Sequence, residues 1–313
     1  MTNRRPPAPA GRDGSDTALS LEEVLSAVES CTRMNNTRAS TWQAPHVLLP
    51  GYRRLFGGQL LAQAIACAVA ASPDVSSKVV RSVHLAFTAE GRPDLAADWS
   101  VEAVQDGSTF ATRSVSVRQG ERVLAAGVVS LHIPDTGPEV LAHSARPPGV
   151  PPATALASVP QSGAMAMEVR CEQALDGLAV GPAELNVWMR AHRPPRPARS
   201  PEGQASAAAE LIASQQLLAY SSDLTMMVAA MRPHDGIGYG SPSVLASAVT
   251  SHTISFHQPF AVDDWLLFAQ SSPVAAGGRA YIRGDWFTAA GALVASCAQE
   301  VLIRAVPSRA TPA

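Results

Sequence analysis

Two long apolar segments of the chain open with the same four residues. The sequence QLLA begins at residue 59 and opens an apolar run to residue 71; it begins again at residue 216 and opens a run to residue 231. Both segments are apolar over most of a helical surface, which is typical of a helix enclosed by other structure. The pattern therefore predicts a buried helix of roughly 14 residues in each half of the chain.

Segments of alternating apolar and polar residues follow the first predicted helix. They cover residues 99–104, 112–117 and 123–133, and the pairs Asp106-Gly107 and Gln119-Gly120 lie between them. Asp-Gly and similar pairs favour tight turns between neighbouring strands. The second half carries comparable pairs at residues 277–278 and 290–291. Each half is therefore predicted to be one helix and an antiparallel meander.

The strand segments also repeat between the two halves. SVHLAF at residues 82–87 matches SHTISF at residues 251–256, and the segment that begins at Gly120 matches the one that begins at Gly291. The spacing stays close to that of the helices, which indicates internal duplication. We expect an α+β double hotdog: two tandem antiparallel sheets, each wrapped round a long central helix, and joined edge to edge so that few strand edges are exposed.

Proline-rich stretches suggest how the chain is divided. Residues 1–20 are predicted to be a flexible tail, residues 21–133 an N-terminal hotdog, and residues 134–164 a Pro-rich linker. Residues 165–306 would form a C-terminal hotdog that carries the candidate site residues. A second Pro/Arg/Ala run at residues 192–205 is expected to be a long loop within that half.

Composition narrows the classes of function. The 313 residues are 46% hydrophobic and 16% charged, with a formal net charge of −2. No basic field is available to bind nucleic acid, and the chain lacks the high charge and low hydrophobicity of a disordered protein. We expect no membrane span and no secretory signal, and hence a cytoplasmic protein. The four cysteines are scattered, which favours reduced buried thiols over a disulfide framework.

Neither a metal site nor a serine nucleophile is indicated. His252 and His257 lie five residues apart, so on a strand they point to opposite faces, and the spacing of nearby acids does not complete a tetrahedral set. The sequence contains no G-x-S-x-G motif of an α/β-hydrolase. We therefore expect a mechanism without a metal or other cofactor.

Several motifs together resemble the acyl-CoA thioesterase II family, the TesB-like double hotdogs. The first half carries FGGQLLAQA at residues 56–64 and DGSTFATRSVSVRQG at residues 106–120. The second carries HTISFHQPF at residues 252–260 and, as the most specific match, RGDWFTAAGALVASCAQE at residues 283–300. The resemblance covers the chain from about residue 50 to residue 304.

The resemblance implies a function and a set of catalytic residues. Members of this family hydrolyse acyl-CoA to free fatty acid and coenzyme A with an activated water, and they are often homo-oligomers built by sheet-to-sheet packing. Their catalytic groups are an Asp on the second helix, a Ser or Thr at the start of the next strand, and a Gln on the last strand. Asp223 and Gln299 occupy the first and third positions.

The hydroxyl position departs from the family pattern. Val249 stands where the family carries Ser or Thr. Because side chains two apart share a face of a strand, we expect Ser251 to supply the hydroxyl. A shift of one residue in the alignment would give Thr250 that role instead.

The departure at Val249 keeps a second function open, namely a hotdog protein that binds acyl-CoA or an acyl carrier without turnover. A hotdog hydratase is disfavoured because the chain has no Asp-x-Asn-Pro-x-His-like segment.

Two interpretations stay open for each polar candidate. Asp223 could be a solvated acid on the outer stripe of its helix or a general base, and Gln299 could form a structural hydrogen bond to a loop or orient the attacking water. Asp223 lies in an apolar segment, and desolvation there would raise its pKa toward the range of a general base. Gln299 lies in an apolar predicted strand, where a buried amide without a partner would cost about 1–3 kcal/mol. A partner for Gln299 is therefore expected.

Overall fold

The computed structural model describes residues 30, 33–38, 40–46, 53–72, 77–134, 137, 142–159, 167–175, 180–193, 206–238 and 245–305. The predicted tail at residues 1–20 lies outside these residues. Within them, no helix is long and apolar enough to cross a membrane.

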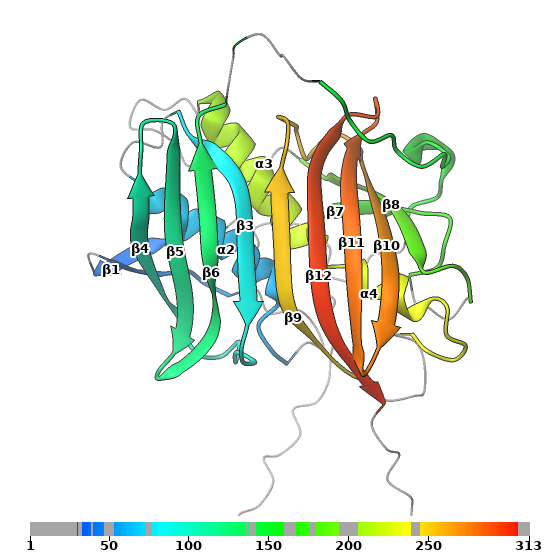
Figure 1. Cartoon of the computed structure of the whole chain (residues 1–313), viewed down its shortest axis with the longest axis horizontal. Helices are drawn as coiled ribbons and strands as arrows, with labels where there is room; N and C mark the ends of the chain where they lie inside the picture. The colour runs from blue at the N-terminus through cyan, green and yellow to red at the C-terminus, as the bar shows by residue number, and fades with distance from the viewer. Residues whose placement is uncertain are drawn as a thin grey trace, which may run out of the picture.

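The strands of the described residues form one continuous sheet of twelve strands, with antiparallel pairing throughout (Figure 1). Their order across the sheet is β1-β2-β4-β5-β6-β3-β9-β12-β11-β10-β8-β7. The bounds are β1 Asn35–Arg38, β2 Thr41–Gln43, β3 Val79–Phe87, β4 Asp98–Asp106, β5 Phe110–Gln119, β6 Arg122–His132, β7 Met167–Arg170, β8 Glu184–Ala191, β9 Leu245–Phe256, β10 Leu266–Ala276, β11 Arg279–Thr288 and β12 Leu293–Ala305.

The two halves of the sheet repeat one strand order outward from the centre. Strands β3 and β9 meet there in an antiparallel pair, with Val83 opposite Ile254. Outward from this pair, β6, β5 and β4 follow on one side, and β12, β11 and β10 on the other. This arrangement confirms the double hotdog, the duplication and the edge-to-edge junction that the sequence predicts.

Among the described residues, three α-helices lie on one face of the sheet, behind it in Figure 1. They are α2 (Gly57–Ala70), α3 (Ala207–Ser222) and the short α4 (Met226–Met231). The sequence predicted one helix through residue 231, but the structure breaks it after Ser222. The hydroxyls of Ser221 and Ser222 donate to the carbonyls of Leu217 and Ala219, and such bonds compete with regular helix geometry. Asp223 therefore caps the end of α3.

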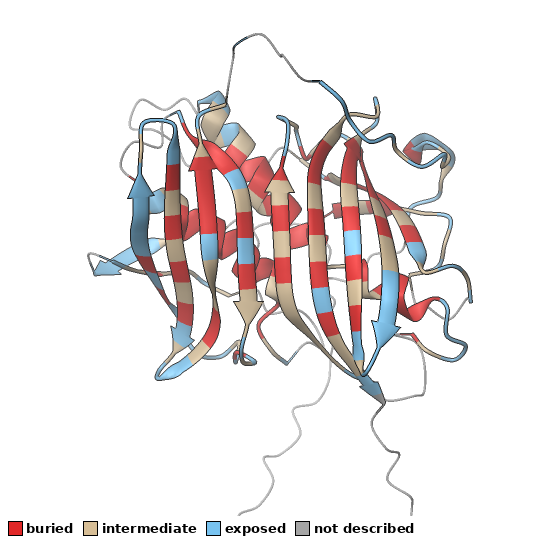
Figure 2. Cartoon of the chain, in the orientation of Figure 1, coloured by how far each residue is buried: buried red, intermediate tan, exposed pale blue. Residues whose placement is uncertain are grey.

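The core lies between the helices and the inner face of the sheet. Figure 2 shows α2 and α3 as largely buried and the strands as alternating between buried and more accessible residues. One cluster of buried apolar side chains includes Leu61 of α2, Leu85 of β3 and Ile254 of β9, so it extends across both halves. Burial of such side chains is the dominant favourable term in folding.

Part of the predicted linker packs against the second half. A 3₁₀ turn covers Ala153–Ala155. Trp188 of β8 donates its indole N–H to the carbonyl of Pro151 at 2.9 Å, and Arg170 of β7 donates to the carbonyl of Ala153 at 3.0 Å. The described part of this stretch is therefore attached to the sheet, while the domain boundaries stay a prediction.

Candidate active site

Asp223 lies where the end of α3 meets the start of α2. Its side chain is 5% exposed, and its Oδ2 accepts a hydrogen bond from the backbone N–H of Gly58 at 2.9 Å. A Cβ at Gly57 would come within 2.7 Å of the same oxygen. The glycine pair therefore allows the first turn of α2 to approach the carboxylate closely.

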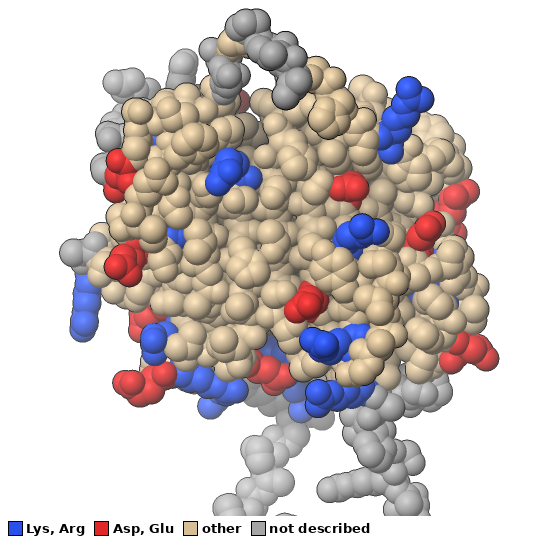
Figure 3. Space-filling model, in the orientation of Figure 1, with Lys and Arg blue, Asp and Glu red and all other residues tan. Residues whose placement is uncertain are grey.

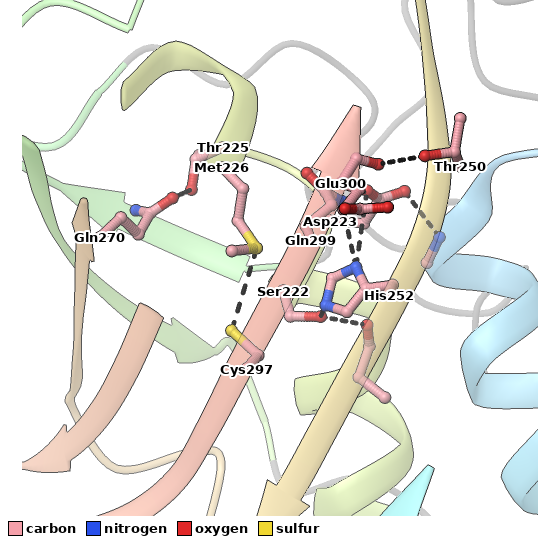
Figure 4. A network of polar contacts seen from close by, with 12 residues as sticks. Ser222, Asp223, Thr225, Met226, Thr250, His252, Gln270, Cys297, Gln299 and Glu300 are labelled. Atoms are coloured by element: carbon pink, nitrogen blue, oxygen red, sulfur yellow. Dashed lines mark hydrogen bonds and ion pairs between the residues drawn. The ribbon is translucent and has the colours of Figure 1, made fainter. Parts of the chain in front are cut away.

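Gln299 reaches Asp223 from β12. Its Nε2 donates to Asp223 Oδ1 at 2.5 Å, and the same nitrogen lies 3.1 Å from Nδ1 of His252 (Figure 4). Gln299 is buried, so these contacts provide the partners that its amide nitrogen requires. The structure thus brings together the two polar residues that the resemblance indicated.

Burial sets the protonation of this cluster. Desolvation raises the pKa of Asp223 from its ordinary 3.8 to about 7, against the lowering effects of Gln299, Gly58 and Arg54. Desolvation also lowers the pKa of His252 to about 3, so that His252 is neutral near pH 7. The carboxylate is therefore poised to exchange a proton near neutral pH.

The expected hydroxyl lies on the wrong face of β9. Ser251 pairs with Glu300, whereas His252 pairs with Gln299 and points toward the helices. Val249 then pairs with residue 301, so the extra residue of a β-bulge is Thr250. This bulge interrupts the regular alternation from which Ser251 was assigned to the Val249 face. Thr250 lines the cavity beside Asp223, and Ser251 is not among its described lining residues.

The cavity beside Asp223 has a volume of about 230 Å³ and an apolar wall. At its edge, Arg54 forms an ion pair with Glu90 at 2.6 Å and donates to the carbonyl of Ser247 at 2.8 Å. Both halves of the chain contribute to the wall, which includes the apolar side chains of Leu55, Leu60, Phe87, Met227, Val249 and Leu302. An apolar cleft with a few convergent polar groups is the usual form of a small-molecule site.

Metal ligands do not gather near this cavity. Within the described ranges, no three His, Cys, Asp or Glu side chains form a group that could hold a metal ion. His252 points inward, and the ring of His257 contacts the hydroxyl of Ser296 at 3.0 Å on the other side of the sheet. The metal-free and cofactor-free mechanism stays a prediction.

Two family models match the chain and together cover more than half of it. Residues 199–302 match the acyl-CoA thioesterase model, and residues 49–132 match the acyl-CoA thioesterase N-terminal domain. The chain belongs to the acyl-CoA thioesterase II family. It is therefore an enzyme of the thioester hydrolase class.

Individual relatives agree with this assignment along most of the chain. Mouse (Mus musculus) acyl-coenzyme A thioesterase 8 is 28% identical over 94% of this chain and 93% of its own length. Acyl-CoA thioesterase 2 of Haemophilus influenzae is 29% identical over 81% of this chain and 89% of its own. The crystal structure of an acyl-CoA thioesterase II from Mycobacterium marinum has a TM-score of 0.66 and 28% identity, covering 91% of this chain and all of that one.

Two contributors to the site of this thioesterase were not identified from the sequence. Gly58 binds the carboxylate through its backbone, and the only signal for it is the Gly-Gly pair before the first helix. His252 was expected only to point to the face opposite His257; its inward position and its contact with Gln299 were not predicted, because strand register is not visible in the sequence.

Proposed function

We propose that this chain hydrolyses acyl-CoA thioesters to free fatty acid and coenzyme A, with Asp223 as the general base. The observation that carries the proposal is a buried carboxylate with a pKa of about 7 at the wall of an apolar cavity, bonded to Gln299. A base with a pKa near the working pH is efficient in proton transfer.

In the proposed reaction, Asp223 removes a proton from a water molecule while the water oxygen attacks the thioester carbonyl. Gln299 orients the water. The hydroxyl of Thr250 lines the cavity and donates to the carbonyl of Glu300 at 3.1 Å; in the proposed reaction it turns its hydrogen from this carbonyl to the carbonyl oxygen of the thioester. The tetrahedral intermediate then expels the coenzyme A sulfur, which takes up the proton from Asp223. This step regenerates the carboxylate.

The first turn of α2 offers a backbone N–H donor for the oxyanion of the tetrahedral intermediate. Gly57 lines the cavity, and its backbone N–H belongs to the first-turn groups that lack an intrahelical acceptor. In a buried site, such a donor stabilises developing negative charge. We assign Gly57 to this role and Gly58 to orienting Asp223.

A thiol-release assay tests the proposal directly. Purified protein is incubated with acyl-CoA of increasing chain length, and free coenzyme A is followed with a thiol-reactive dye. We expect release that is linear in time and in enzyme concentration for at least one chain length. If calorimetry detects acyl-CoA binding but no chain length gives release, the non-catalytic binding protein suggested by Val249 is the correct description.

A further inference from the structure

The amide nitrogen of Gln299 has two acceptors in the structure. It lies 2.5 Å from Asp223 Oδ1 and 3.1 Å from His252 Nδ1. A side-chain amide nitrogen carries two hydrogens and accepts none, so both hydrogens are used by these contacts. His252 Nδ1 must therefore be the unprotonated nitrogen of the ring.

The other side of the imidazole is consistent with this tautomer. His252 Nε2 lies 3.2 Å from the hydroxyl of Ser222, and that hydroxyl donates its single hydrogen to the carbonyl of Ala219 at 2.8 Å. Ser222 must therefore accept from Nε2–H. Figure 4 shows the connected contacts from Ser222 through His252 and Gln299 to Asp223.

His252 keeps one charge state across the working pH range. Its side chain is 0% exposed, and desolvation lowers its pKa to about 3, with His84 of β3 acting in the same direction. Asp223 also faces it, with Oδ1 4.0 Å from Nδ1. The ring thus remains an acceptor at Nδ1 whether or not Asp223 is ionised.

Because His252 Nδ1 is an acceptor, it disfavours the flipped orientation of the Gln299 amide. An ionised Asp223 needs an N–H from Gln299, but a protonated Asp223 could donate to a flipped amide oxygen. A flipped amide would place its oxygen against the lone pair of His252 Nδ1. We propose that His252 is a positioning residue, which holds the Gln299 amide with Nε2 on Asp223 and leaves Oε1 as the acceptor for the attacking water. The catalytic part of this inference rests on the proposed function.

The fall of kcat/KM at low pH, the acid limb of the pH profile, should therefore depend on His252. The hydrogen bond from Gln299 lowers the pKa of Asp223 relative to burial alone. If the amide is released, this bond weakens, the pKa of Asp223 rises, and the acid limb of kcat/KM moves to higher pH.

His252→Leu and His252→Asn form the test pair. Leucine removes the acceptor, whereas asparagine can place its amide oxygen near the position of Nδ1. For His252→Leu we expect the acid limb to move up by about one pH unit, with an about tenfold loss of kcat/KM at pH 6 that falls mainly on kcat. His252→Asn should restore the wild-type limb. A wild-type limb and kcat in folded His252→Leu, or the same shift in both variants, would overturn the proposal.

Thr225→Val is the matched control for a purely structural effect. Thr225 donates to Gln270 at 3.0 Å in a buried pair two residues from Asp223, outside the His252 network. This variant should lower Tm without moving the acid limb. A limb shift equal to that of His252→Leu would make general destabilisation the cause and reject the positioning role.

Two NMR measurements test the proposal without turnover, and the first of them needs only the wild-type protein. Ring nitrogen shifts of the wild-type protein should show the proton of His252 on Nε2; a proton on Nδ1 would overturn the proposal. Carboxyl titration should give a higher pKa for Asp223 in His252→Leu than in wild type. If that shift is present while no acyl-CoA is hydrolysed, the positioning of Gln299 stands and the proposed function fails.

Discussion

The carboxylate of Asp223 is surrounded by groups that act on its pKa in opposite directions. The N–H of Gly58 and the amide of Gln299 favour the ionised form, but the loss of water disfavours it more strongly. The folded-state pKa of about 7 therefore lies above the ordinary value of 3.8. The same shift that suits a general base reduces stability when the group is ionised.

This shift predicts a pH-dependent stability difference between wild type and Asp223→Asn. Between about pH 4 and pH 7 the folded wild type holds a proton that the unfolded chain has released, so its stability falls as pH rises through this window. From pH 4 to pH 8, wild type should lose roughly 1–4 kcal/mol more than Asp223→Asn. Urea unfolding at several pH values measures the difference. If the free energies of unfolding of the two proteins change with pH in parallel, the raised pKa of Asp223 is excluded.

Thr250 and Ser251 give a second prediction at the residue scale. Thr250→Val keeps the shape of the side chain and removes its hydroxyl, so turnover should fall by about tenfold or more, which corresponds to one hydrogen bond. Ser251→Ala should leave turnover near wild type, because Ser251 pairs with Glu300 away from the cavity. Steady-state kinetics of both variants shows whether Thr250 or Ser251 supplies the hydroxyl. Loss in Ser251→Ala alone would restore the original assignment.

Asp223 and Gln299 were predictable from the sequence and the hydroxyl at the cavity was not, for a physical reason. Asp223 and Gln299 lie in motifs whose order resembles the family, so their positions could be transferred. The bulge at Thr250 adds one residue to β9 without a Gly or Pro to mark it, and a slip of one residue exchanges the faces of a strand. Ser251 was therefore assigned to the wrong face.

At the scale of elements, α2 and α3 approach each other closely at Gly58. A Cβ there would lie 2.2 Å from the carbonyl oxygen of Tyr220, which belongs to the backbone of α3. At Gly57 the obstacle is the carboxylate of Asp223, which can rotate away. The two neighbouring glycines therefore serve different purposes: one permits helix packing, and the other leaves room for the site.

These contacts predict different outcomes for two alanine variants. Gly58→Ala should destabilise the fold by about 1–3 kcal/mol or more, because backbone must move to remove the overlap. Gly57→Ala should change Tm less but reduce kcat/KM, since the new methyl group displaces Asp223. Thermal unfolding and kinetics on both proteins test this. Equal Tm losses and equal activity would contradict the two separate roles.

The strands and turns were more predictable than the helix end. The turns at Gly120, Gly277, Gly278 and Gly291 have positive φ, as their turn-forming pairs suggested. The break in the second helix depends on side chains that bond back to the backbone, and residues 223–231 remain apolar enough to resemble one continuing helix. Hydrophobic pattern alone does not distinguish these cases.

On the scale of the whole molecule, the two repeats together carry one complete set of the proposed catalytic residues among the described residues. At the 157-residue spacing of the helix repeats, Asp223 corresponds to Ala66 and Gly58 to Gln215. The Gln215 amide bonds both backbone groups of Val80 on β3, at 3.1 and 2.7 Å. The position related to the candidate site by the repeat therefore has Ala66 in place of the carboxylate, and the Gln215 side chain stands where the glycine would be.

The shared site predicts that neither half is active alone. Gly57 and Gly58 come from the first half, and Asp223 and Gln299 from the second. Residues 21–133 and 165–306, produced separately, should release no coenzyme A, whereas their co-expression should restore release if they associate through the β3–β9 pair. Activity of the second half by itself would contradict a site that requires both.

The outer face of the sheet carries few charged side chains (Figure 3). It also exposes apolar residues such as Val128, which is 43% exposed. Sheet-to-sheet packing would bury this face, so it is the surface on which to test the predicted homo-oligomer. Oligomeric state and cytoplasmic location both stay predictions.

Turnover by Asp223→Asn tests the central claim most directly. The substitution keeps the size of the side chain and removes its ability to accept the proton of water. We predict a folded protein whose kcat for acyl-CoA is lower by about 10²–10⁴, the usual contribution of a general base. A correctly folded Asp223→Asn protein that releases coenzyme A at the wild-type rate would contradict the account.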